Sequence, residues 1–171
     1  QQFLLFAAFG MRDAIMPVTA FSYGMGSKQR ICDGIRCGLL FTEIMMLFGL
    51  LLVELLAKPF SGVFGVSPET LSPFLSAMRV ISVSFLFAGA NIAFQGIYQA
   101  LDGGMESLVI SLLRQLVLVF PLVLLFMHLA GNASEKAWYI WLAFPLTELL
   151  TMLAGILLLK RITKRKLTAL T

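Results

Sequence analysis

Apolar residues fill five long stretches of the sequence, and short segments rich in charge, glycine or proline separate them. A helix needs about 20 mostly apolar residues to cross the roughly 30 Å hydrocarbon core of a bilayer, because no water there satisfies its backbone. Each stretch is long enough for this. We therefore predict an all-α, polytopic transmembrane helix bundle with spans at about 3–24, 38–57, 79–101, 108–130 and 138–159.

The overall composition agrees with a membrane protein. Of the 171 residues, 59% are hydrophobic and 13% are charged, whereas charged residues make up about a quarter of a soluble domain. The two cysteines, Cys32 and Cys37, provide no disulfide framework and lack the further ligands of a zinc site. The sequence thus predicts neither a metal site nor a nucleic-acid surface.

The distribution of Lys and Arg predicts the orientation. With the basic tail 160–171 in the cytoplasm, eight Lys and Arg residues lie inside and three lie outside, which follows the positive-inside rule. The three outside are Lys58, Arg79 and Lys136. Five spans then place the start of the chain outside, so an earlier span is required. Because the sequence also lacks an initiator Met, we expect a fragment of a longer chain.

Charged side chains within the predicted spans are the first functional candidates, since a charge in lipid costs several kcal/mol unless it is paired or hydrated. Arg12 and Asp13 lie in the middle of the first span, and Glu148 lies deep in the fifth. Neighbours on a helix point about 100° apart, so we expect that Arg12 and Asp13 do not simply neutralise each other. Asp13 and Glu148 are candidate sites for a coupling ion, and a structural polar pair is the alternative for Asp13.

Prolines occur within three of the predicted spans, at Pro17, Pro121 and Pro145. Each removes a backbone donor and favours a kink. One interpretation is that these prolines allow the helices to bend during a transport cycle. The alternative is that they only kink the helices and have no role in transport.

A polar face follows the third span at steps of three or four residues. It consists of Ser84, Ala88, Asn91, Gln95 and Gln99. One interpretation is a tight helix interface held by amide hydrogen bonds. The other is the wall of a substrate cavity, in which Phe94 and Tyr98 add apolar contacts.

Two of the segments that connect the spans have a predictable structure. Segment 58–73 mixes apolar residues with Gly, Ser and Pro, and we expect an interfacial loop that ends where Thr70 or Ser72 caps the next helix. The short connection at 102–105 predicts that the third and fourth spans form an antiparallel hairpin.

Motifs of enzymes and ATP-driven motors are missing from the sequence. It contains no H-E-x-x-H, no nucleophile elbow and no full P-loop. We therefore expect a protein that is not an enzyme.

Three runs of residues resemble one known family. They are Pro17 to Tyr23-Gly24 with Arg30 downstream, Leu113-Arg114-Gln115 with Pro121, and Pro145-Leu146-Thr147-Glu148. In this order they resemble the C-terminal part of the multidrug and toxic compound extrusion (MATE) family, at about helices 8 to 12. The resemblance implies a twelve-helix transporter of two six-helix bundles, with gating or structural roles for Pro17, Tyr23, Gly24, Arg114, Pro121 and Pro145.

The resemblance also implies a function. Such transporters export drugs and organic cations by antiport against H⁺ or Na⁺, without a cofactor, and the implied location is the bacterial plasma membrane. The missing N-terminal half of the same chain and the lipid bilayer are the implied partners. Some members carry a carboxylate where this chain has Asn91, and an amide cannot titrate. A flippase for lipid-linked glycans from the same superfamily and a non-transporting membrane scaffold remain the alternatives.

Overall fold

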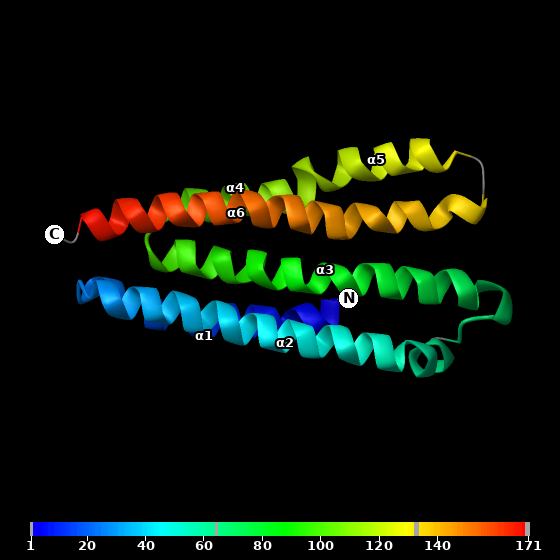
Figure 1. The fold of residues 1–171 in the computed structure, drawn as a ribbon, viewed down its shortest axis with the longest axis horizontal. Helices are drawn as coiled ribbons and strands as arrows, with labels where there is room; N and C mark the ends of the chain where they lie inside the picture. The colour runs from blue at the N-terminus through cyan, green and yellow to red at the C-terminus, as the bar shows by residue number, and fades with distance from the viewer. Residues whose placement is uncertain (1, 64, 132–133, 170–171) are drawn as a thin grey trace.

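The computed structural model describes residues 2–63, 65–131 and 134–169, and nearly all of them are helical (Figure 1). The elements in chain order are α1 (Gln2–Gly24), α2 (Lys28–Val63), α3 (Pro68–Ala100), α4 (Gly104–Leu112), a π-helical turn (Leu113–Val117), α5 (Val119–Ala130), a 3₁₀ segment (Ser134–Leu142) and α6 (Ala143–Thr168). The described residues include five helical stretches that are long and apolar enough to cross a membrane. The predicted all-α bundle of five spans is confirmed.

Helix α3 forms the centre of the bundle. Figure 1 shows α3 between the α1–α2 pair on one side and α4, α5 and α6 on the other. In its most apolar window 72% of the residues are buried, compared with 28% or fewer in the other four spans. Two glycines permit this close packing: Gly96 of α3 lies against Arg12 of α1, and Gly155 of α6 lies against Phe94 of α3.

The helices extend well beyond the predicted spans at the end opposite the C-terminus. Helix α2 has 36 residues and contains Pro59, and α3 has 33 residues and contains Pro73. The predicted loop at 58–73 was therefore wrong, because both helices continue into it. The N-cap of α3 is Ser67 rather than Thr70 or Ser72, and Pro68 follows at the first helical position, where a proline removes no helical hydrogen bond.

Two of the three prolines lie near helix starts. Pro121 is the third residue of α5, and Pro145 is the third residue of α6, directly after the 3₁₀ segment. Pro145 lies within the candidate span Trp138–Thr168, as predicted, but a change of helix type precedes it. Pro17 is within α1, as predicted.

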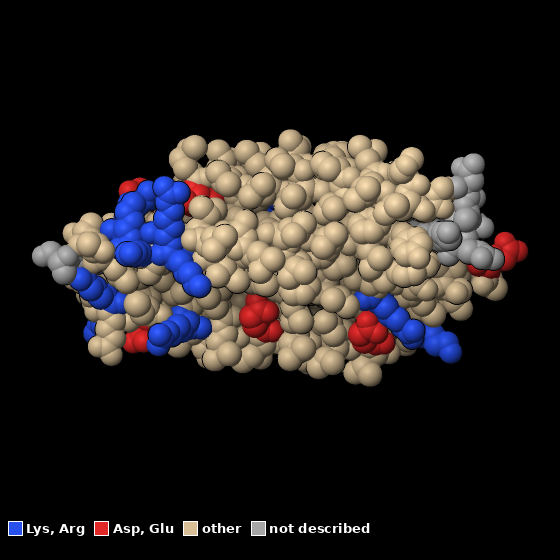
Figure 2. Space-filling view, turned by 45° about the horizontal axis from the view of Figure 1, so that its top comes forward, with Lys and Arg blue, Asp and Glu red and all other residues tan. Residues whose placement is uncertain are grey.

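Most of the Lys and Arg residues visible in Figure 2 gather at the end where α6 finishes. Two ion pairs connect the end of α6 to the α3–α4 turn and to the first turn of α4. Lys166 Nζ lies 3.0 Å from Asp102 Oδ2, and Arg165 Nη2 lies 2.9 Å from Glu106 Oε1. Asp102 has a φ of 56° and occupies the left-handed region. This turn joins α3 and α4 as a hairpin.

Candidate functional site

A buried ionic network lies where α3, the π turn and α6 meet. The Nε of Arg114 donates to Oε1 of Glu148 at 2.6 Å, and the two side chains are only 8% and 9% exposed. The Nδ2 of Asn91, which is fully buried, donates to Oε2 of Glu148 at 2.8 Å and to its backbone carbonyl at 2.9 Å. Both carboxylate oxygens of Glu148 therefore have a donor.

The π turn places Arg114 in this network. The N–H of Leu118 donates to the carbonyl of Leu113 at 3.0 Å, five residues back. Such a wide turn inserts one residue, so the faces of α4 and α5 are offset by about 100°. Pro121 lies four residues after Val117 and offers no N–H to the carbonyl of Val117. The local sequence thus favours the irregular turn that carries Arg114.

A cavity of about 290 Å³ borders the ion pair. It is lined by Leu5, Phe9, Arg114, Gln115, Val119, Phe144, Thr147 and Glu148. Arg114 and Glu148 are the charged members of this lining, and the others are mostly apolar. Gln115, Phe144 and Thr147 were not candidate site residues from the sequence, although Gln115 and Thr147 lie in the runs that carry the resemblance.

Two polar atoms beside the network lack a hydrogen-bond partner among the described residues. They are Oδ1 of Asn91 and Oγ1 of Thr147, and both side chains are buried. A buried polar atom without a partner costs about 1–3 kcal/mol, and native structures contain few of them. An amide oxygen, a hydroxyl and a carboxylate are the group types that hold a small cation or a water.

Asp13, the other acidic candidate, lies in a different environment. Its side chain is 60% exposed on α1, and its Oδ1 lies 2.8 Å from Nη2 of Arg12. The expectation that Arg12 and Asp13 do not neutralise each other was wrong, because the long Arg12 side chain reaches around the helix to its neighbour. Asp13 is not part of the Glu148 network.

The polar face of α3 divides into buried contacts and one exposed position. Ser84, Ala88, Asn91 and Gln95 are buried, whereas Gln99 is exposed and donates to Oγ of Ser107 at 3.0 Å. Phe94 and Tyr98 are buried as well, and the Tyr98 hydroxyl donates to the carbonyl of Gly155 at 2.6 Å. Most of this face therefore contacts neighbouring helices.

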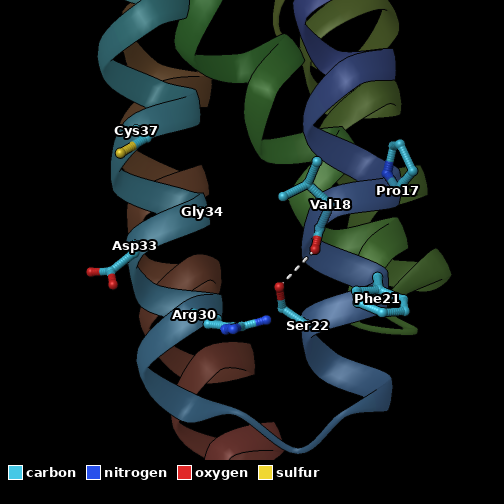
Figure 3. Close-up of a pocket in the computed structure, with 8 residues that line it drawn as sticks. All are labelled: Pro17, Val18, Phe21, Ser22, Arg30, Asp33, Gly34 and Cys37. Carbon is cyan, nitrogen blue, oxygen red and sulfur yellow. Dashed lines mark hydrogen bonds between the residues drawn. The ribbon is translucent and has the colours of Figure 1, made fainter.

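The remaining predicted residues lie toward the basic end. Pro17 lines an open hollow of about 590 Å³ between α1 and α2. Figure 3 shows Arg30 reaching from α2 toward Ser22 of α1, whose hydroxyl donates to the carbonyl of Val18 at 2.8 Å. Gly24 ends α1, and the ring of Tyr23 lies 5.7 Å from Nζ of Lys166. None of these residues contacts the Glu148 network through a described interaction.

A family model, a curated relative and solved structures match this chain. The MatE family model matches residues 1–125. The FAD transporter of Shewanella oneidensis is 27% identical over 159 residues, which cover 93% of this chain and 34% of that transporter. The structure of the MATE multidrug transporter DinF-BH is also 27% identical, with a TM-score of 0.82 over 94% of this chain and 35% of that one.

A third structure shows the same fold at lower identity. It is an inward-facing multidrug resistance MATE family transporter of the MOP superfamily, with a TM-score of 0.85 and 17% identity over 99% of this chain and 38% of that one. The fold is that of a multi-pass membrane protein with the helical arrangement of the solved MATE structures. The chain belongs to the MatE family. It spans about a third of the length of the relatives it matches.

Proposed function

We propose that this chain is the C-terminal part of a secondary active antiporter, which exports amphipathic or cationic compounds in exchange for H⁺ or Na⁺ by alternating access. The observation that carries the proposal is the buried network of Glu148, Arg114 and Asn91 beside the 290 Å³ cavity. Ionisable groups within membrane spans mark ion and substrate pathways, because their burial is otherwise unfavourable.

Glu148 is the group in this network that can exchange an ion. As a carboxylate it attracts Arg114 and accepts from Asn91. A proton on Glu148, or a cation beside it, weakens the attraction to Arg114 and changes the contact between the π turn and α6. A change of this kind can bias an equilibrium between two conformations, provided that the ion binds them with different affinities. Asp13 is the second candidate for coupling, on the exposed face of α1.

We propose a cytoplasmic position for the basic end of the bundle, in the plasma membrane of a bacterium. The eight Lys and Arg residues there, against three at the other end, support this orientation.

A second candidate function is FAD export. The observation in its favour is the FAD transporter of Shewanella oneidensis, which matches 93% of this chain. FAD carries a negatively charged pyrophosphate, so its export needs a cation in the pathway, and Arg114 lines the cavity. A cationic drug in the same cavity would instead be attracted by the Glu148 carboxylate.

The test uses the complete protein in proteoliposomes. Efflux of ethidium is followed while a proton gradient and then a sodium gradient of equal size is imposed, and the measurement is repeated with FAD inside the vesicles. We expect one of the two gradients to accelerate ethidium efflux. Acceleration of FAD efflux alone would support the second candidate. If the folded protein moves neither compound under either gradient, the antiporter proposal is wrong. That result would favour the flippase or the scaffold alternative.

A further inference from the structure

A separate groove runs along the surface between the start of α2 and the end of α6. Its volume is about 590 Å³, and both helices contribute apolar and cationic side chains. The apolar ones include Ile35, Leu159 and Leu167, and the cationic ones are Arg36, Lys160 and Lys164. Figure 2 shows basic side chains crowded at this end of the molecule.

The three cations of the groove are exposed, and none of them forms a salt bridge with the Asp and Glu residues that the structure describes. Their neighbours Arg165 and Lys166 are neutralised by Glu106 and Asp102. No acidic side chain lines the groove within the described part of the chain. The hydroxyl of Thr163, also in the wall, lacks a hydrogen-bond partner there. The groove is therefore positive and offers unused donors.

We propose that this groove binds an anionic phospholipid, with the phosphate on Arg36, Lys160 and Lys164 and an acyl chain along the apolar wall. The charge of the groove is complementary to an anionic headgroup, and its walls match a hydrocarbon chain. Basic pockets between membrane helices near one membrane surface bind anionic headgroups in this way. A free phosphate would use the cations but would leave the half-buried Leu159 and Leu167 uncovered, so the apolar wall favours a lipid.

The first test measures lipid retention by the complete protein in native mass spectrometry, with phosphatidylglycerol or phosphatidylcholine added to the detergent solution. The wild type is expected to retain phosphatidylglycerol in preference. In the variant R36Q/K160Q/K164Q the affinity for phosphatidylglycerol should fall by roughly fivefold for each charge removed. The matched control is K28Q/R30Q/R161Q, which removes three charges at the same end but outside the groove, and it should keep the preference.

The two cysteines provide a second readout that does not need a variant. Cys32 lines the groove, whereas Cys37 lines the hollow between α1 and α2. Alkylation by N-ethylmaleimide is followed at each cysteine by peptide mass spectrometry. Phosphatidylglycerol should slow the reaction of Cys32 and leave that of Cys37 unchanged.

Several results would overturn the proposal. These are equal retention of both lipids by the wild type, an equal loss in the groove variant and the control variant, or displacement of the lipid by millimolar inorganic phosphate. Cys32 that reacts equally slowly with and without lipid would also overturn it, because another part of the complete protein would then fill the groove. Transport activity enters none of these measurements, so the outcome is independent of the proposed function.

Discussion

Replacement of Glu148 by alanine is expected to destabilise the complete protein by about 3–5 kcal/mol, because the buried guanidinium of Arg114 then loses its counter-charge. Asn91 also loses an acceptor, since its Nδ2 donates to the Glu148 carboxylate. The measurement is the free energy of unfolding in detergent, from denaturant titration. The surface pair between Asp102 and Lys166 provides the control, because its carboxylate is 88% exposed. Asp102→Asn should cost at most about 1 kcal/mol.

A double-mutant cycle separates the ion pair from other effects of the substitution. The double variant Arg114→Leu, Glu148→Leu removes both charges, so no unpaired charge stays buried. Replacing a buried ion pair by apolar residues is often close to neutral for stability. The double variant should therefore be more stable than Glu148→Leu alone. If the two single effects simply add, the two residues are not coupled and the network described above is wrong.

The second large effect is expected for Gly96→Val. A Cβ at Gly96 would lie 2.6 Å from Cγ of Arg12 and 3.1 Å from the Arg12 backbone oxygen. The side chain of Arg12 can move, but its backbone cannot move without displacing α1 from α3. Overpacking of this kind costs about 1–3 kcal/mol or more. We expect a clear fall in the thermal unfolding midpoint and in the yield of monodisperse protein.

The matched control is Gly62→Val in α2, where an added Cβ meets no atom within 4 Å. Its unfolding midpoint should remain close to that of the wild type. Equal midpoints for Gly96→Val and Gly62→Val would show that α1 and α3 do not pack closely at Gly96.

The sequence predicted the number of spans correctly because membrane burial imposes a simple rule on length and apolar composition. Helix ends were predicted less well. Hydropathy reports the part of a helix within the hydrocarbon core, whereas the 36-residue α2 continues past it to Val63. The signal for the start of α3 was present in Ser67-Pro68, an N-cap followed by a first-turn proline.

The candidate site was predictable only in part. Glu148 stands out as an acid deep in an apolar span, and the resemblance singled out Arg114. Their contact was not predictable, since the two residues are 34 positions apart and the π turn decides which face Arg114 occupies. Hydrophobic periodicity assumes a constant 3.6 residues per turn, so an inserted residue escapes it. Helix angles alone did not predict the Arg12–Asp13 contact, because the long Arg12 side chain reaches its neighbour in spite of the roughly 100° between them.

The central claim is that Glu148 couples transport to an ion. The most direct measurement compares Glu148→Gln with the wild type in proteoliposomes, under whichever gradient drives efflux. Glu54→Gln is the matched control, since Glu54 accepts from Ser82 between α2 and α3, away from the network. Glu148→Gln should lower gradient-driven efflux by about 5- to 150-fold, while the Glu54→Gln control stays close to wild type. Gradient-driven efflux at the wild-type rate in folded Glu148→Gln protein would contradict the account.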